Sequence, residues 1–256
     1  MPTAFAVVLL VIAGLAVGSF LNVCIYRLPR HLSIVWPASR CPACERPLAW
    51  YENIPVLSYA VLGGRCRTCK ARIGLRYPIV EIATAAGFVL EYLVLGWTPL
   101  LAVRLLFVST MIVLFAIDLE HQVLPNVITL PGLICGLVFA LFLPPGLRDA
   151  LIGVVVGAGV LFAIAEGYYR LRGDEGMGMG DVKMLSMIGA FLGWKLTILT
   201  LVLASFAGSF AGILLLVSRR GTLKAALPFG TFLAAAAFVA STAGEGILAW
   251  YLSFYQ

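Results

Sequence analysis

The stretch Gly176-Met177-Gly178-Met179-Gly180-Asp181-Val182-Lys183 places three alternating glycines before an aspartate, at the start of an apolar run. Glycine has no Cβ, so another backbone can approach it closely and left-handed conformations cost little. An ionisable group at the edge of a membrane is a functional-site hypothesis by default, because burying its charge is expensive. Asp181 could instead simply cap the helix that follows it. The stretch alone leaves both interpretations open.

The composition around this stretch is that of a membrane protein. The 256 residues are 62% hydrophobic and only 12% charged, with a mean hydropathy of +1.03. Soluble domains are closer to half apolar and a quarter charged. Because a membrane-spanning helix needs about 20 apolar residues, the chain has room for roughly eight. We therefore expect an all-α polytopic membrane protein, with about eight transmembrane helices and one polar loop domain.

The expected spans follow one another along most of the chain. They lie near residues 4–25, 79–95, 100–117, 127–143, 149–169, 182–193, 196–217 and 228–252. The 182–193 segment is too short to cross a membrane unless it is tilted, re-entrant or extended. Pairs of glycines four residues apart suit close helix packing; they are Gly14/Gly18, Gly153/Gly157 and Gly208/Gly212.

The distribution of positive charge predicts the orientation. Threading the spans alternately puts 27–78, 118–126, 170–181 and 218–227 on one side. All Lys and Arg residues except Arg104, Arg148 and Lys195 then lie on or beside that side. An excess of Lys and Arg marks cytosolic loops, so both termini are expected outside. The cytosolic loops therefore account for the net charge of +6, and we predict no nucleic-acid partner. Loop arginines are expected against anionic lipid headgroups.

Three regions follow from this threading: residues 1–26 as the first transmembrane helix, 27–78 as a cytosolic zinc-binding loop domain, and 79–256 as a transmembrane helical bundle. The loop holds Cys41-Pro-Ala-Cys44 and Cys66-Arg-Thr-Cys69. Two such pairs can deliver four thiolates to one structural Zn²⁺. Disulfides are the competing interpretation, but they rarely persist in the cytosol. Cys24 and Cys135 lie within expected spans, where cysteine serves as a small packing residue.

A second carboxylate, Asp118, ends the third expected span and reaches the same cytosolic boundary as Asp181. Two carboxyl groups within hydrogen-bonding reach share a proton, because they cannot both ionise cheaply. One can then activate water as a general base while the other acts as a general acid, which is the chemistry of aspartic proteolysis. Alternatively, Asp118 is only the polar end of a span, as we interpret Glu120 and His121 nearby.

Gly-x-Gly-Asp with a distant partner aspartate resembles the GxGD intramembrane aspartic proteases, and the fuller pattern resembles their type IV prepilin leader peptidase branch. The matching stretches cover essentially the whole chain. Besides the four cysteines and the two aspartates, they are GSFLNVCIYRLP at 18–29, NIPVLS at 53–58, RYP at 76–78 with Glu81, the segment 118–126 and PFG at 228–230.

The resemblance implies cleavage of type IV prepilins or pseudopilins, after a glycine, at the cytosolic face of the bacterial inner membrane. The sequence leaves open whether such substrates serve a type IV pilus, a type II secretion system or DNA uptake. It also implies methylation of the new N-terminal amine with S-adenosylmethionine. By residue match, Asp118 and Asp181 are catalytic and Cys41, Cys44, Cys66 and Cys69 bind zinc. Gly64 and Arg65 are candidates for methyl transfer.

A different class of function is a non-enzymatic membrane assembly factor or a proton-coupled transporter. The zinc loop would then dock a partner, and the aspartates would relay protons. A transporter more often has inverted repeats and broken helices near the middle of the bilayer. The sequence has no internal repeat, and both aspartates lie at the membrane edge. These features favour the enzyme.

Overall fold

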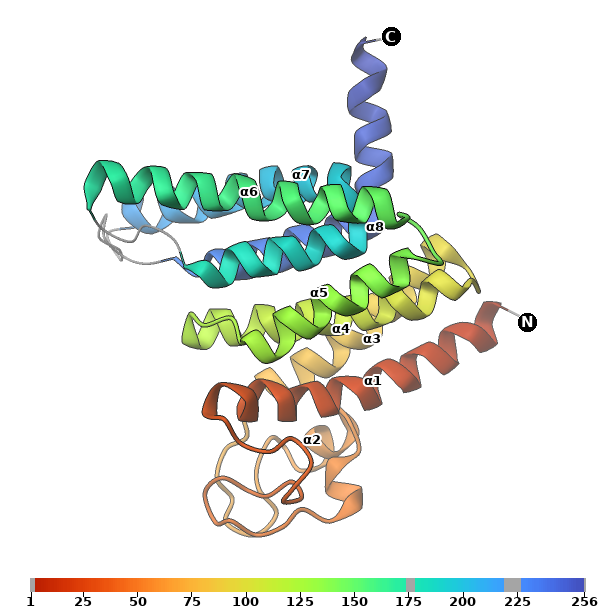
Figure 1. The fold of residues 1–256 in the computed structure, drawn as a ribbon. Helices are drawn as coiled ribbons and strands as arrows, with labels where there is room; N and C mark the ends of the chain where they lie inside the picture. The colour runs from red at the N-terminus through yellow and green to blue at the C-terminus, as the bar shows by residue number, and fades with distance from the viewer. Residues whose placement is uncertain (1–2, 174–177, 219–226, 256) are drawn as a thin grey trace. The chain divides into compact units, whose positions relative to one another are not determined.

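The structure, a computed structural model, describes residues 3–173, 178–218 and 227–255. Gly176 and Met177 of the glycine-rich stretch, and the cations Arg219, Arg220 and Lys224, lie outside these residues. The regular elements of the described chain are all helical, which confirms the expected all-α class (Figure 1). The chain divides into two compact units, residues 1–101 and 102–256.

The first unit is built on α1 (Thr3–Arg27) and α3 (Arg76–Leu95), which pack against each other. A Cβ on Gly14 would lie 2.5 Å from the Ala85 Cα, and one on Gly18 would lie 2.7 Å from the Glu81 Cα. The two backbones are therefore in direct contact, which only glycine allows. The close packing expected of Gly14 and Gly18 is confirmed.

Between α1 and α3 the chain forms a domain of turns and loops. Its helical elements are short: the 3₁₀ turns Leu28–Arg30 and Trp50–Asn53, and α2 (Leu57–Val61). Two single β-bridges, Arg40 with Pro47 and Arg65 with Arg72, each close one cysteine-bearing turn. Prolines and glycines in this stretch disfavour long helices, which accounts for the absence of one between residues 31 and 75.

The second unit contains α4 (Pro99–His121, from residue 102 onward), α5 (Asn126–Ala140), α6 (Leu147–Arg172), α7 (Met179–Val217) and α8 (Phe229–Leu252). α7 packs along α5, α6 and α8. Its contact with α6 is made at backbone level, because a Cβ on Gly153 would lie 2.5 Å from the Gly189 carbonyl oxygen. A Cβ on Gly157 would lie 2.7 Å from the Leu185 carbonyl oxygen, so this expected glycine pair is also confirmed.

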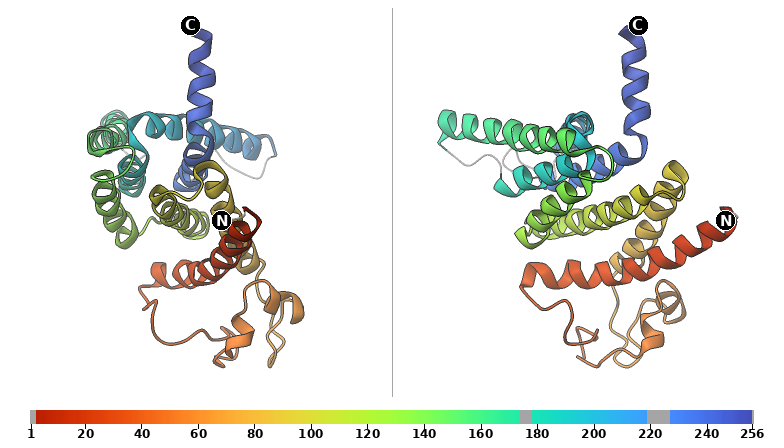
Figure 2. Two further views of the ribbon diagram at one scale, coloured as in Figure 1. Left: turned by 90° about the vertical axis from the view of Figure 1, so that its right-hand side faces the viewer. Right: turned by 45° about the vertical axis from the view of Figure 1, so that its right-hand side comes forward.

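α7 is broken at Gly193, whose backbone has φ 76° and ψ 169°. Residues that carry a side chain rarely adopt a positive φ, whereas glycine does so at little cost. The helix axis changes direction there (Figures 1 and 2). The break falls between the expected segments 182–193 and 196–217, so the division of this stretch into two segments is confirmed.

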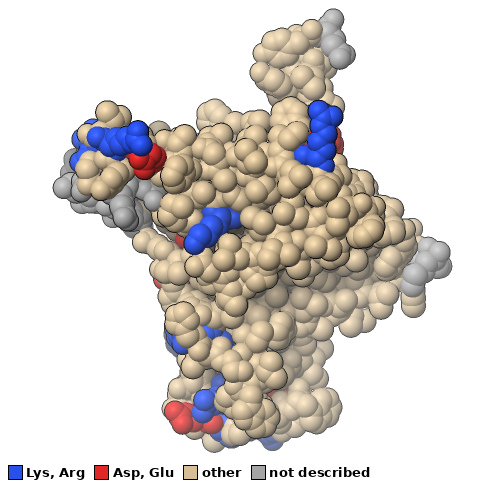
Figure 3. Space-filling view, viewed as in Figure 1, with Lys and Arg blue, Asp and Glu red and all other residues tan. Residues whose placement is uncertain are grey.

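Six described helices are long and apolar enough to cross a membrane. α5, with 15 residues, is shorter than that. Within the second unit, the face seen in Figure 3 carries its charged side chains mainly toward helix ends, and most of the helical surface is uncharged. The chain is thus a multi-pass membrane protein. Its expected number of eight spans stays a prediction.

Candidate functional site

Asp118 lies in the last turn of α4 and is buried, with 5% of its surface exposed. Its Oδ2 accepts a hydrogen bond of 2.6 Å from the Thr231 N–H and one of 3.0 Å from the Thr231 hydroxyl. Thr231 is the third residue of α8, where backbone N–H groups lack intrahelical acceptors. A carboxylate is favourable there because it faces the positive end of the helix dipole. The start of α8 therefore holds the Asp118 side chain.

Asp181 is the third residue of α7 and is half-buried. The N-cap position belongs to Gly178, so the interpretation of Asp181 as the capping residue is wrong. Asp181 is close enough to Asp118 for the two carboxyl groups to interact electrostatically. The structure thus brings together two aspartates that are separated in the sequence by two whole helices, α5 and α6.

Two contacts around this pair were not expected from the sequence. A Cβ on Gly180 would lie 3.1 Å from the Leu124 Cβ, and one on Gly230 would lie 3.0 Å from both the Asp118 Cγ and the Leu124 Cδ1. Leu124 therefore sits between the backbone that precedes Asp181 and the backbone that precedes Thr231. The PFG stretch at 228–230 belongs to the sequence pattern that resembles the peptidase family, but that pattern does not predict a contact between Gly230 and Leu124.

The beginnings of α5 and α7 are also joined. The Lys183 Nζ donates a hydrogen bond of 2.9 Å to the Asn126 Oδ1. Lys183 follows Asp181 by two residues, and Asn126 opens α5 directly after the Leu124-Pro125 segment. This bond keeps the Leu124 segment beside the first turn of α7.

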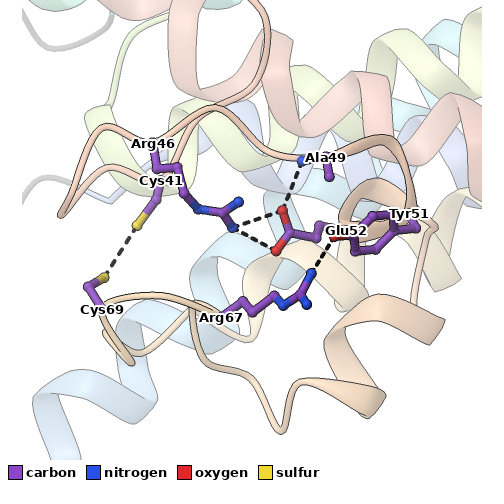
Figure 4. A network of polar contacts seen from close by, with 7 residues as sticks. All are labelled: Cys41, Arg46, Ala49, Tyr51, Glu52, Arg67 and Cys69. Atoms are coloured by element: carbon purple, nitrogen blue, oxygen red, sulfur yellow. Dashed lines mark hydrogen bonds and ion pairs between the residues drawn. The ribbon is translucent and has the colours of Figure 1, made fainter.

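The four loop cysteines form a cluster suited to a metal. Their Sγ atoms all lie within 4.8 Å of one another, with 3.8 Å between those of Cys41 and Cys69 (Figure 4). None of the four is in a disulfide. Four cysteine sulfurs gathered in this way suit the tetrahedral coordination of Zn²⁺. The geometry is therefore compatible with a zinc site. Cys24 is buried in α1 as expected, whereas Cys135 of α5 is exposed.

The two cysteine turns have the same local construction. The Cys41 N–H donates to the Arg46 carbonyl, as the Cys66 N–H does to the Ala71 carbonyl. The fifth residue of each turn, Glu45 and Lys70, adopts a positive φ of 55° and 58°. Desolvation and the neighbouring cysteine sulfurs raise the pKa of the Cys69 thiol to about 11, whereas backbone N–H groups of Cys69 and Thr68 lower the pKa of the Cys66 thiol to about 6. A lowered pKa favours the thiolate, which is the form that binds metal.

A partly buried ion pair ties the first cysteine turn to the rest of the loop. The Arg46 Nη2 donates to both oxygens of Glu52 at 2.6 and 2.8 Å, and the Ala49 N–H donates to one of them at 2.8 Å (Figure 4). These bonds lower the pKa of the Glu52 carboxyl. Beside the pair, Arg67 donates to the Tyr51 hydroxyl. The loop is thus held by a polar network as well as by any metal.

Gly64 and Arg65, the candidates for methyl transfer, lie directly before the second cysteine turn. Gly64 has a positive φ of 65°, and a Cβ there would lie 2.7 Å from the Tyr59 hydroxyl oxygen. A groove of about 430 Å³ lies close by in the same domain, lined in part by Tyr51, Ser58 and Arg67. Gly64 and Arg65 do not line this groove.

Comparisons with known proteins match both units of the chain. The Bacterial Peptidase A24 N-terminal domain matches residues 12–95, and the Type IV leader peptidase family matches residues 105–213. A "Prepilin leader peptidase/N-methyltransferase" of Pseudomonas aeruginosa is 38% identical over 99% of this chain and 95% of its own length. A relative with the same description from Aeromonas salmonicida is 40% identical over 94% of this chain and 91% of its own length. Another, from Myxococcus xanthus, is 45% identical over 84% of this chain and 64% of its own length. No solved structure matches the chain.

Proposed function

Because this chain belongs to the type IV leader peptidase family, we propose that Asp118 and Asp181 cut prepilin leaders after a glycine, at the cytosolic face of the bacterial inner membrane. Its relatives are described as peptidases and N-methyltransferases, so the enzyme is favoured over an assembly factor or a transporter. The observation that carries the proposal is the meeting of two carboxyl groups from α4 and α7, one of them clamped by the start of α8.

The chemistry follows from a pair of carboxyl groups that share one proton. The ionised carboxylate removes a proton from a water molecule, whose oxygen attacks the scissile carbonyl carbon. The protonated carboxyl group gives its proton to the amide nitrogen as the C–N bond breaks. The leader leaves with a new carboxyl group, and the mature protein keeps a free N-terminal amine. Neither step requires a metal ion.

The test is a cleavage assay in detergent with a prepilin-like substrate. Wild type would be compared with Asp118→Asn and Asp181→Asn, which keep the side-chain shape but cannot ionise and so lose the shared proton. Mass spectrometry would identify the new N-terminus. We expect both variants to lose cleavage while keeping wild-type zinc content. Glu120→Gln, an exposed carboxylate two residues beyond Asp118, is the matched control and should cut normally. Normal cleavage by either aspartate variant would refute the dyad.

We further propose that the loop domain binds S-adenosylmethionine, which supplies an activated methyl group for the new amine. The groove beside Tyr51 and Arg67 is large enough for a ligand of this size. An aromatic ring and a guanidinium at its edge suit an adenine ring and a carboxylate. Gly64 and Arg65 connect this groove with the second cysteine turn, so we assign them a role in shaping the methyl-transfer site.

Binding and methylation can be separated from cleavage. Calorimetric titration with S-adenosylhomocysteine would compare wild type with Arg67→Ala and Arg65→Ala. We expect Arg67→Ala to weaken S-adenosylhomocysteine binding and to reduce methylation. Cleavage of the leader after glycine should continue at the wild-type rate. Arg72→Ala is the control, because Arg72 pairs with Arg65 in a single β-bridge and does not line the groove. Unchanged affinity in Arg67→Ala would exclude the groove as the donor site.

The topology completes the proposal. We propose eight membrane segments, with α5 and both parts of α7 counted as spans, a structural Zn²⁺ in the loop domain, and both termini outside. The break at Gly193 supports the division of α7. At about 1.5 Å per residue, α5 is about 22 Å long, shorter than the hydrocarbon core. It therefore needs local thinning of the bilayer or help from the residues that follow it.

A further inference from the structure

Leu124 occupies the space beside the two aspartates. It lies in the short segment between α4 and α5 and is half-buried. The Cβ position of Gly180 lies 3.1 Å from the Leu124 Cβ, and that of Gly230 lies 3.0 Å from the Leu124 Cδ1. Both are closer than most real Cβ contacts. The room left by the two missing side chains is therefore already filled by Leu124.

The same contacts place Leu124 at the catalytic pair. Gly180 directly precedes Asp181, and the Cβ position of Gly230 also lies 3.0 Å from the Asp118 Cγ. The Leu124 and Asp118 side chains thus flank one glycine, while Leu124 also touches the backbone beside Asp181. A peptide carbonyl held between the two carboxyl groups would lie next to the Leu124 side chain.

Leu124 is also restrained from moving away. The Gln122 N–H donates to the Asp118 carbonyl at 2.8 Å, which fixes the start of the segment. Pro125 follows directly and restricts the backbone. At the far end, the Asn126 side chain accepts the 2.9 Å bond from Lys183. The segment is therefore anchored on both sides of Leu124.

We propose that Leu124 is the residue that restricts the substrate to glycine at the position before the scissile bond. This inference rests on the proposed cleavage by Asp118 and Asp181. The substrate residue that provides the scissile carbonyl brings its Cα to the dyad, so a Cβ on it meets Leu124. Because Leu124 is packed against two backbones and its segment is anchored, it does not yield space cheaply. Glycine alone avoids the collision.

The test removes side-chain volume at residue 124 of the enzyme and adds side-chain volume to the substrate residue before the cut. Wild type, Leu124→Ala and the control Val123→Ala would be assayed with one prepilin-like substrate carrying glycine, alanine, serine or valine before the cut. Val123 is exposed and adjacent in sequence, and its atoms are not among the nearest to the Cβ position of any described glycine. One methyl group in an apolar site changes kcat/KM by roughly 10-fold to 200-fold. We expect Leu124→Ala to raise the alanine-to-glycine ratio of kcat/KM by about tenfold or more, and Val123→Ala to keep the wild-type ratio.

The outcomes separate this inference from the proposed function. If wild type fails to cut the glycine substrate, the peptidase proposal falls and the inference falls with it. If wild type cuts it and Leu124→Ala keeps the wild-type ratio, only the inference is overturned. Leu124→Val removes less volume and guards against misfolding of the alanine variant. It should give a smaller gain for alanine, and an unchanged ratio would overturn the inference. A folded Leu124→Ala that cuts no substrate would also overturn it, because Leu124 would then be needed for cleavage itself.

Discussion

Thr231 donates both its backbone N–H and its hydroxyl to one oxygen of Asp118, at 2.6 and 3.0 Å, across 113 residues of sequence. Both donors reach Oδ2, so the two bonds together orient the carboxyl group. The N–H is one of the first in α8, where such groups have no acceptor within the helix. The bond from the Thr231 N–H therefore satisfies a free donor at the start of α8, and it also positions a proposed catalytic carboxyl group.

Thr231→Val should slow cleavage without altering the fold, because valine keeps the branched shape and the backbone N–H but removes the hydroxyl. A hydrogen bond to a charged group contributes about 1.5–3 kcal/mol, so kcat should fall about tenfold or more. KM should change little, since the bond orients Asp118 and does not touch the substrate. Steady-state kinetics with the glycine substrate would measure both.

Thr231→Ser provides the control for this prediction. Serine restores the hydroxyl with less bulk and should recover most of the wild-type kcat. Equal rates in the valine and serine variants would mean that the hydroxyl does not position Asp118, whatever the packing role of this residue.

Gly153→Ala should destabilise the second unit, because its Cβ would lie 2.5 Å from the Gly189 carbonyl oxygen. Overpacking of this kind typically costs about 1–3 kcal/mol. The matched control is Gly159→Ala, also on α6, where a Cβ meets no atom within 4 Å. Thermal unfolding in detergent should show a lower midpoint for the first variant and an equal or higher midpoint for the second. Equal midpoints would argue against backbone contact between α6 and α7.

Removal of one cysteine should release zinc. Wild type should carry one zinc ion per chain by elemental analysis, and Cys44→Ser or Cys69→Ser should carry much less, because structural sites need all four ligands. The loop domain should then become sensitive to proteases, since metal binding contributes to its folding. Cys135→Ser, which changes a cysteine on α5 outside the cluster, should retain the metal. Full zinc occupancy in both cluster variants would refute a four-cysteine site.

The cysteine cluster could be predicted from the sequence because each pair is organised locally. The same N–H to carbonyl bonds and the same positive φ recur in the Cys41 and Cys66 turns. Leu124 and Thr231 could not be predicted in this way. Their roles depend on which helix ends meet, and hydropathy shows where helices lie but not how they cross. Gly230 was the available signal, since a glycine early in a helix can mark a close approach.

The same limit applies to α7. The sequence predicted two apolar segments on either side of residues 193–196, and Gly193 does break the helix. What the sequence did not predict is the packing that requires this glycine: a Cβ there would lie 2.9 Å from the Pro145 Cβ. Pro145 lies just before α6, so the break depends on a neighbour that is distant in sequence.

The break leads to a prediction about sidedness. The segment from Asp181 to Gly193 is about 18 Å long at 1.5 Å per residue, and it starts at the aspartate pair. At its far end Lys195 lines a cavity of about 450 Å³ together with Arg148, at the start of α6.

If this short segment crosses the membrane, Arg148 and Lys195 lie outside and the aspartates lie in the cytosol. Arg148→Cys and Lys195→Cys should then react with a membrane-impermeant maleimide added to intact spheroplasts. Trp50→Cys, at an exposed position of the loop domain, should react only after the membrane is opened. Labelling of Trp50→Cys in intact spheroplasts would reverse the proposed orientation. Protection of Arg148→Cys and Lys195→Cys until the membrane is opened would mean that the 181–193 segment re-enters on the cytosolic side, and the count of eight spans would fall.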